Sequence, residues 1–168
     1  MNIAVYPGSF DPVTYGHLDL IKRGSRVFDK LIVAVGENPA KSALFSLDER
    51  VEMVKRHTRG IHNVTVDKFR GMLVDYVKRK GAHVILRGIR TVSDFEYEFQ
   101  MALTNRALER GVETVFVMTS EECSYFRASL IREVASLGGS LRTFVPPDVE
   151  KQLKKKLAAH LKAQRNSF

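Results

Sequence analysis

The chain has 168 residues, 44% hydrophobic and 27% charged, a composition typical of a single folded domain spanning 1–168 rather than of a disordered chain. No apolar run approaches the roughly 20 residues that cross a bilayer, and no basic region precedes the first apolar stretch, so we expect a cytoplasmic protein. The net charge of +8 raises the question of an acidic partner, and the single cysteine, Cys123, excludes an internal disulfide.

Short apolar runs alternate with helical patterns along the chain. The strands are expected near 2–6, 31–36, 63–68, 83–87 and 113–118, and the helices near 17–28, 47–59, 72–80, 94–110, 128–137 and 148–163. Each strand run is mostly apolar rather than alternating, which favours strands buried on both faces of a parallel sheet. Five successive strand–helix units predict an α/β fold with a single doubly wound parallel five-stranded sheet.

Local signals support several of these boundaries. Ser46 with Glu49, and Ser93 with Glu96, have the spacing of a capping box at a helix start. Gly81 and Gly111 fall where helices should stop. In a doubly wound sheet, ligands bind beyond the carboxyl ends of the strands. We therefore expect one crevice to be surrounded by the loops at 7–17, 37–45, 69–73, 87–93 and 119–129.

The segment from Gly8 to His17 is the strongest motif in the chain. It joins an apolar strand to a helix through a turn rich in Gly and Pro, a layout that presents backbone N–H groups and the positive end of a helix dipole to a phosphate. His17 follows Gly16 at the expected helix start, near Ser9, and adds a donor aimed at the same anion. The turn therefore predicts a polyphosphate site.

Cationic side chains follow two other strands. Arg87 and Arg90 flank a glycine directly after the fourth strand, which suits two neighbouring anions; the alternative is a surface pair bridging to Asp94 or Glu96. Lys41 lies in the loop after the second strand. Because these loops share one edge of the sheet, we expect the three cations to surround the crevice.

Two further segments supply polar groups. Glu98, near the start of the long helix, could hold ribose hydroxyls. The stretch from Ser124 to Ser129 leads into a helix and offers hydroxyl and N–H groups to a phosphate or ribose, although ordinary helix capping explains Ser129 equally well.

The excess basic charge is concentrated at the C-terminal end. Of the 27 Lys and Arg residues, six lie within residues 151–168, which contain no Asp or Glu, so the other 21 nearly balance the 19 acidic residues. Leu153, Leu157 and Leu161 give the basic helix 148–165 one apolar side. We expect it to pack on its own domain or on a neighbouring subunit, with its charges solvated; the alternative is a module that binds nucleic acid or a membrane surface.

Several familiar sites are absent from the sequence. It has neither a P-loop nor a dinucleotide fingerprint, and no zinc spacing of Cys and His. No Ser or Cys has an evident base, which argues against a covalent intermediate. We expect no metal bound by protein ligands.

At this point the motifs resemble a known family. The run Gly8-Ser9-Phe10-Asp11-Pro12 with Thr14-Tyr15-Gly16-His17 is similar to the signature of the nucleotidyltransferase superfamily. The segments Asn38–Lys41, Arg87–Arg90, Asp94–Glu98 and Asn105-Arg106, with the chain length, resemble bacterial phosphopantetheine adenylyltransferases. The resemblance implies a Rossmann-like fold, a cytoplasmic homohexamer, and transfer of the adenylyl group of ATP to 4′-phosphopantetheine with Mg²⁺, giving dephospho-coenzyme A and pyrophosphate.

The resemblance also implies roles for individual residues. The catalytic residues would be His17, Lys41 and Arg90. ATP would contact Ser9, Phe10, His17, Gly88, Ile89, Arg90, Glu98, Cys123, Ser124, Tyr125, Phe126, Arg127, Ala128 and Ser129. Phosphopantetheine would contact Ser9, Lys41, Leu73 and Arg87. The chain departs from the family pattern at Cys123, where many members have an aromatic residue, and at 126–129, where they carry a run of serines.

The chemistry is coherent without a protein nucleophile. The acceptor phosphate would attack the α-phosphorus of ATP in line, and the cations would neutralise the charge that develops. Two related activities stay open: transfer to nicotinate mononucleotide, and cytidylyl transfer from CTP.

Overall fold

The computed structural model describes residues 1–37, 42–120 and 128–165, with side chains up to residue 159. Its elements are, in chain order, β1 (Ile3–Gly8), α1 (Tyr15–Val27), β2 (Lys30–Gly36), α2 (Leu47–Thr58), β3 (Val64–Phe69), α3 (Leu73–Arg79), β4 (Val84–Ile89), α4 (Val92–Leu108), β5 (Glu113–Met118), α5 (Ala128–Ser136) and α6 (Pro147–Arg165). The predicted elements and their order are confirmed, with ends shifted by a few residues. In the described part of the chain, no helix is long and apolar enough to cross a membrane.

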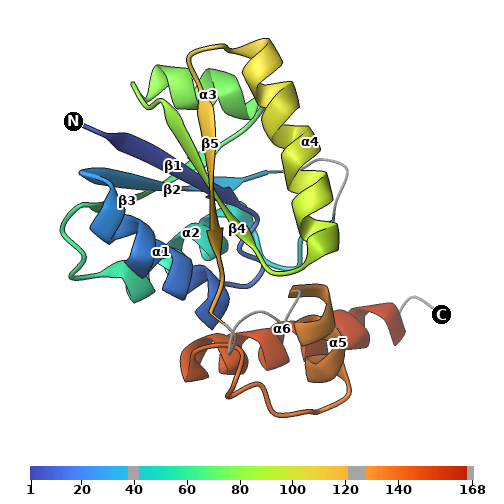
Figure 1. Ribbon diagram of the computed structural model, residues 1–168. Coiled ribbons are helices and arrows are strands. Elements are labelled where there is room, and N and C mark those ends of the chain that lie inside the picture. Colours follow the sequence, from blue (N-terminus) through green and yellow to red (C-terminus); the bar gives the residue numbers. More distant parts are fainter. Residues whose placement is uncertain (38–41, 121–127, 166–168) are drawn as a thin grey trace.

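All five strands belong to one parallel sheet in the order β3-β2-β1-β4-β5 (Figure 1). β1 lies in the middle, with Val5 beside Ile32 of β2 on one side and beside Ile85 of β4 on the other. The chain builds outward from β1 to β3, then returns to build outward through β4 and β5. The reversal opens a crevice beyond the carboxyl ends of β1 and β4, as the doubly wound prediction required.

The central strands are buried on both faces. On β1, Ala4 and Tyr6 join one apolar core, whereas Val5 between them joins another. The first core packs under α1, α2, α5 and α6, and the second under α3. The edge strands differ: β3 and β5 contain only partly buried and exposed residues. The expectation that every strand is buried on both faces is therefore wrong for these two.

The two predicted capping boxes have different outcomes. At α2, the Ser46 hydroxyl accepts from the Glu49 N–H at 3.2 Å, and the Glu49 carboxylate accepts from the Ser46 N–H at 2.7 Å. At α4, the cap is Thr91, whose hydroxyl accepts from the Asp94 N–H at 3.1 Å. The helix begins before Ser93, so the second box is wrong. Gly81 follows α3 with a φ of +63°, a conformation that favours glycine.

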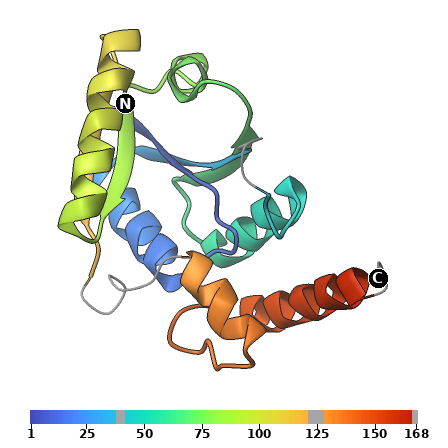
Figure 2. The same cartoon turned by 90° about the vertical axis from the view of Figure 1, so that its right-hand side faces the viewer.

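The C-terminal helices lie together below the sheet, and the far end of α6 extends away from the body (Figures 1 and 2). Leu153 of α6 is fully buried, and Leu157 packs partly against the same core, so packing on its own domain is confirmed. Two of its lysines stay partly exposed, as expected, but also form ion pairs. Lys156 pairs with Glu49 of α2 at 2.6 Å, and Lys154 pairs with Glu150 at 2.7 Å.

We expect Leu153→Ala to lower the free energy of unfolding by about 3 kcal/mol, because it removes buried methyl groups and leaves a cavity. Urea unfolding at neutral pH measures the change. Lys155→Gln, on the exposed side of the same helix, is the matched control and should change stability by less than about 0.5 kcal/mol. Equal losses in the two variants would contradict the packing of α6 described above.

Candidate active site

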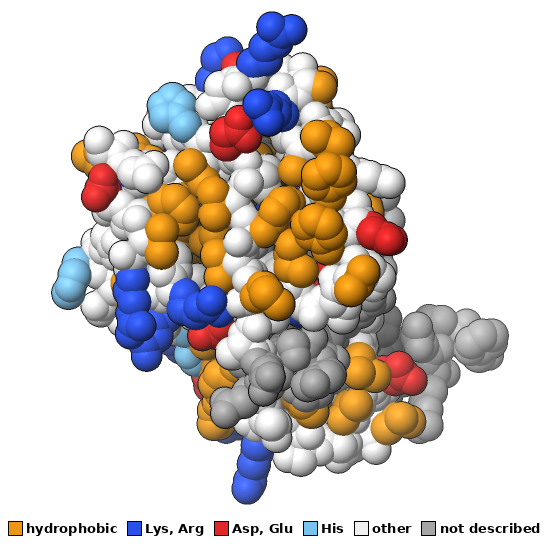
Figure 3. Space-filling model, viewed as in Figure 1, with side chains coloured by type: hydrophobic (Ala, Val, Ile, Leu, Met, Phe, Trp, Pro, Cys, Tyr) orange, Lys and Arg blue, Asp and Glu red, His pale blue; other side chains and the backbone are white. Residues whose placement is uncertain are grey.

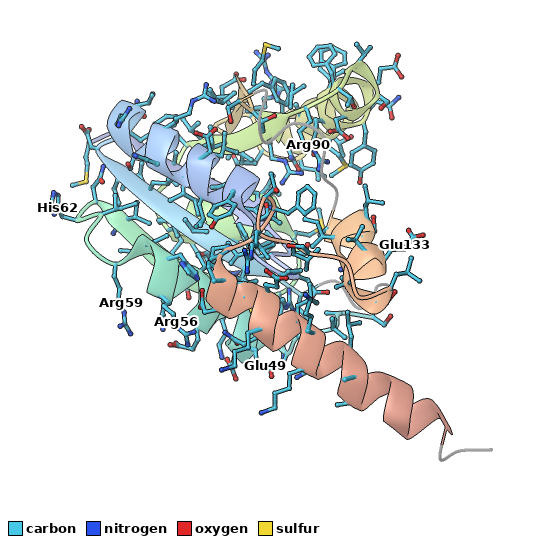
Figure 4. The ribbon with its side chains drawn as sticks, turned by 90° about the horizontal axis from the view of Figure 1, so that it is seen from below. Glu49, Arg56, Arg59, His62, Arg90 and Glu133 are labelled. Atoms are coloured by element: carbon cyan, nitrogen blue, oxygen red, sulfur yellow. The ribbon has the colours of Figure 1, made fainter. Side chains whose placement is uncertain are left out.

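A cleft of about 1050 Å³ lies beyond the carboxyl ends of β1 and β4. It is lined by the turn between β1 and α1, the loop before α2, the end of β4, the start of α4 and the start of α5. Arg90 lies on the cleft side of the molecule, whereas Arg59 and His62 project from the opposite surface (Figure 4). Described residues of the loops predicted at 7–17, 37–45, 87–93 and 119–129 do meet there, whereas none of the loop at 69–73 lines the cleft, so that part of the prediction is wrong.

The turn after β1 takes an unusual backbone conformation. Phe10 has a φ of +49°, which is uncommon for a residue with a Cβ. Its ring is fully buried and makes edge contacts with Tyr6, 5.5 Å between centroids, and with His17, at 4.9 Å. A Cβ on Gly8 would lie 2.8 Å from the Phe10 ring. The glycine therefore makes room for the aromatic ring that supports His17.

His17 completes a capping box at the start of α1. The Thr14 hydroxyl accepts from the His17 N–H at 3.3 Å, and the His17 Nδ1 accepts from the Thr14 N–H at 3.0 Å. Because Nδ1 accepts a backbone proton, the ring proton is on Nε2. Burial, with smaller contributions from Arg90 and Arg87, lowers the pKa of His17 to about 4. At neutral pH the ring is therefore an uncharged Nε2–H donor lining the cleft.

Most backbone donors at the start of α1 already have partners. The Tyr15 N–H donates to the Phe144 carbonyl at 2.9 Å, and the His17 N–H donates to Thr14. Among the described residues, only the Gly16 N–H of the first three in this helix has no acceptor. The expected cradle of free N–H groups is thus reduced to one in the helix itself. Side-chain cations must supply most of the positive charge.

Two arginines at the end of β4 supply such charge. Arg87 donates through Nε to Glu98 at 2.7 Å, through Nη2 to the same carboxylate, and through Nη1 to the Pro7 carbonyl at 2.8 Å. The pair with Glu98 raises the pKa of Arg87 against the opposing effect of its burial. Arg90 donates to Asp94 at 2.9 Å, the bridge weighed as the alternative for this residue. Both guanidinium groups nevertheless line the cleft.

Comparisons with known proteins agree with this geometry. The model of the cytidylyltransferase-like family matches residues 5–134. The chain is 57% identical over 156 residues to the phosphopantetheine adenylyltransferase of Caldanaerobacter subterraneus subsp. tengcongensis, covering 93% of this chain and 98% of that protein. It is 55% identical to that of Desulfosudis oleivorans, covering 94% of each chain. The chain belongs to the phosphopantetheine adenylyltransferase family.

Solved structures of lower identity show the same fold. Plasmodium falciparum nicotinic acid mononucleotide adenylyltransferase, complexed with NaAD, has a TM-score of 0.68 at 13% identity, covering 95% of this chain and 96% of that one. The lipopolysaccharide core biosynthesis protein of Thermoplasma volcanium has a TM-score of 0.52 at 20% identity, covering 71% and 97%. These likenesses show the Rossmann-like fold, whereas the sequence relatives reported above show that the chain is a nucleotidyltransferase.

The adenylyltransferase cleft collects many of the predicted residues, but not all. Those that line it are Ser9, His17, Arg87, Gly88, Arg90, Glu98, Ala128 and Ser129. Phe10, Ile89 and Leu73 are not among the described lining residues: Phe10 is fully buried, and Leu73 packs partly against the second core. Lys41 and the segment from Cys123 to Arg127 lie outside the described residues, so their contacts stay predictions.

The adenylyltransferase site also contains charged residues that sequence reasoning missed. Arg132 of α5 lines the cleft and donates to the Asp11 carbonyl at 2.7 Å and to its carboxylate at 3.2 Å. Arg50 of α2 lines it too, with only 3% of its surface exposed. Asp11 is buried, and its partners lie 33 to 121 positions away in sequence. No local pattern signals contacts of that range.

The lowered pKa of His17 predicts a loss of stability in acid. Between pH 6.5 and about 4, an unfolded chain binds a proton on this ring that the folded protein does not. The free energy of unfolding therefore decreases as the pH is lowered through this range. His17→Gln, which can keep the cap but cannot titrate, should lose less stability on acidification. Urea unfolding of both proteins near pH 7 and near pH 5 measures the difference. Equal losses would contradict the assignment of a neutral, low-pKa ring.

Proposed function

We propose that this protein transfers the adenylyl group of ATP to 4′-phosphopantetheine, giving dephospho-coenzyme A and pyrophosphate. The observation that carries the proposal is the identity of 54–57% with proteins named phosphopantetheine adenylyltransferase, over more than nine-tenths of each chain. The cleft supports it independently, because it combines a neutral histidine donor with several guanidinium groups, a chemistry suited to phosphates.

The reaction needs positioning and charge rather than a protein nucleophile. An oxygen of the acceptor phosphate forms a bond to the α-phosphorus of ATP, and the bond from that phosphorus to the β-phosphate oxygen breaks, so pyrophosphate carries away the electron pair. His17 Nε2–H would donate to an oxygen on the α-phosphorus as charge develops there. Arg90 would hold the phosphates of ATP, and Arg87 the phosphate of the acceptor.

The Arg87–Glu98 pair constrains how the acceptor can bind. Each nitrogen of Arg87 already donates to Glu98 or to Pro7. An incoming phosphate would use the second N–H of Nη1 or Nη2, or would displace Glu98. The charge of Arg87 is therefore held in place by a carboxylate before substrate arrives. Lys41, in the neighbouring loop, would share the acceptor phosphate.

Mg²⁺ is proposed to enter with ATP. Among the described residues, no group of three His, Cys, Asp or Glu could cage a metal ion. The acids of the cleft are Asp11, Glu37, Asp94 and Glu98, and each already accepts an N–H bond or pairs with an arginine. The described side chains thus do not fit a dedicated site, and phosphate oxygens and water would be the main ligands. Bound there, the ion would neutralise phosphate charge.

Incubation with ATP and 4′-phosphopantetheine tests the proposal. We expect dephospho-coenzyme A and pyrophosphate in equal amounts, resolved by chromatography and a coupled pyrophosphate assay. Parallel reactions with nicotinate mononucleotide as acceptor, and with CTP as donor, test the two related activities. Product from either of these, without product from 4′-phosphopantetheine, would overturn the assignment.

We further propose that the protein is a homo-oligomer, in keeping with the hexamer expected from the family resemblance. Hydrophobic side chains gather over α4 and the edge strand β5 (Figure 3). The exposed ones include Val92, Phe95, Phe99, Leu103, Val115 and Met118, with exposures from 37% to 78%. A concentration of exposed apolar side chains on one face marks a protein interface, and a second copy of the chain is the partner we propose.

Phe99→Glu should dissociate the oligomer, because it places a charge at the centre of this apolar face. Light scattering coupled to gel filtration measures the mass of wild type and variant. Arg110→Glu, an exposed charge beyond the end of α4, is the control and should keep the wild-type mass. A monomeric wild type, or a Phe99→Glu variant of unchanged mass, would contradict the proposed interface.

A further inference from the structure

A buried arginine joins three segments at the rim of the cleft. Arg50 Nη1 donates to the Ser9 carbonyl at 2.8 Å and to the Gly36 carbonyl at 2.9 Å, and Nε donates to the Phe45 carbonyl at 3.2 Å. Ser9 belongs to the turn after β1, Gly36 ends β2, and Phe45 ends the loop after β2. One side chain on α2 thus sets the spacing between the phosphate turn and the neighbouring loop.

Hydrogen bonds to carbonyl oxygens do not by themselves require the positive charge of Arg50. Its guanidinium forms no ion pair with a carboxylate of the described residues, although burying an uncompensated cation is costly. Nη2 has no acceptor among those residues, and Arg50 is one of the residues that line the cleft. The cation therefore faces the space where phosphates would bind. Those phosphates would provide its counter-charge.

A second charged residue holds the same loop from the other side. The Asp11 carboxylate accepts from the Leu44 N–H and the Phe45 N–H, each at 2.9 Å. Phe45 is consequently fixed at both its N–H, by Asp11, and its carbonyl, by Arg50, and its ring is buried. Loops at binding sites are usually among the more mobile parts of a protein. Here two charged side chains hold the backbone of Leu44 and Phe45.

We infer that Arg50, with Asp11 as its counterpart, is a positioning residue for adenylyl transfer. It fixes the phosphate turn at Ser9 against the end of β2 at Gly36 and against Phe45, and so sets the position of the turn that leads to His17. The inference rests on the proposed function. In such reactions a misplacement of about 1 Å costs on the order of 10²-fold in rate, so the spacing that Arg50 sets has a measurable kinetic consequence.

Arg50→Lys tests the inference because it keeps the charge but cannot bond the three carbonyls with the planar fork of arginine. The control is Arg56→Lys, on the same helix, where Arg56 forms an exposed pair with Asp148. We expect the folded Arg50→Lys enzyme to lose about 10²-fold in kcat/KM and to bind ATP about fivefold more weakly by calorimetry. Arg56→Lys should match wild type in both.

A merely structural role would give a different result. Arg50→Lys would then melt at a lower temperature, but its kcat per folded site and its KM values would equal those of wild type, and the inference would be overturned. Chemical rescue adds a second readout. Ethylguanidinium, entering from the cleft that Arg50 lines, should restore turnover to Arg50→Ala but leave wild type unaffected; absence of rescue in a folded Arg50→Ala protein would contradict the inference.

Asp11→Asn tests the inference if the arginine variants do not fold. It keeps an acceptor for one of the two N–H groups and should show the same loss in kcat/KM and ATP affinity. Unfolding of every variant would overturn the inference, because both residues would then serve the stability of the fold. A wild type that binds ATP but forms no dephospho-coenzyme A would overturn the proposed function instead, and the ATP titrations would still test Arg50.

Discussion

His17→Ala is expected to fold and to lose on the order of 10²–10³ in turnover, the cost of removing one donor that acts in the transition state. The structure supports this magnitude because the ring is uncharged, has its proton on Nε2, and is held by Thr14 and Phe10. Steady-state kinetics with both substrates measures the loss. The substitution should lower kcat more than it changes either KM, because the hydrogen bond from His17 strengthens as charge develops in the transition state.

Two control variants separate catalysis from capping in this experiment. His17→Gln can preserve the capping box, so it should match wild type in helix stability while remaining slow. His62→Ala removes an exposed histidine far from the cleft and should be silent. Turnover of His17→Ala within threefold of wild type, about 0.65 kcal/mol, would refute the assigned role.

Arg87→Gln should affect both stability and acceptor use. It leaves the Glu98 carboxylate, whose side chain is 13% exposed, without its cation. We expect the free energy of unfolding to fall by about 2–3 kcal/mol, below the 3–5 kcal/mol of a fully buried pair because Arg87 is itself 29% exposed. The KM for phosphopantetheine should rise by about 10²-fold, the usual cost of losing a charged hydrogen-bond partner of the substrate.

The double variant Arg87→Gln with Glu98→Gln separates these two effects. Two neutral amides can bond to each other, so most of the lost stability should return, whereas acceptor use should stay impaired. Urea unfolding and acceptor titrations on the four proteins of this cycle give both numbers. Recovery of acceptor use together with stability would show that Arg87 only supports the fold.

The fold could be predicted from the sequence because its signals are local. Apolar runs such as Leu31–Val35 specify buried strands, and Ser46 with Glu49 caps α2 as its spacing indicates. The start of α4 was mispredicted because Thr91 and Ser93 both offer hydroxyls and only one can be the cap. The exposure of β5 depends on its place at the sheet edge, which no single segment encodes.

The sequence predicted those site residues that lie close to the carboxyl end of a strand along the chain. His17 lies in the first turn of the helix that follows β1, Arg87 lies near the end of β4 and Arg90 directly follows it, so the topology brings them together. Arg50 lies on a helix and reaches the cleft across 41 positions to Ser9, a contact that only tertiary packing creates. The start of α1 also has a local signal in the sequence: Thr14 and His17 have capping-box spacing, with histidine in place of the usual Glu or Gln.

The contacts of the turn at Asp11 and Tyr15 have a consequence for synthesis of the chain. Arg132 and the Phe144 carbonyl, which hold these two residues, emerge from the ribosome some 120 or more residues after them. Strands β1 to β5 can pair while the chain is still growing, but the turn lacks these two supports until residue 144 is available. The first motif in the sequence is thus among the last to reach its final geometry, and nascent chains have a sheet before they have a competent nucleotide site.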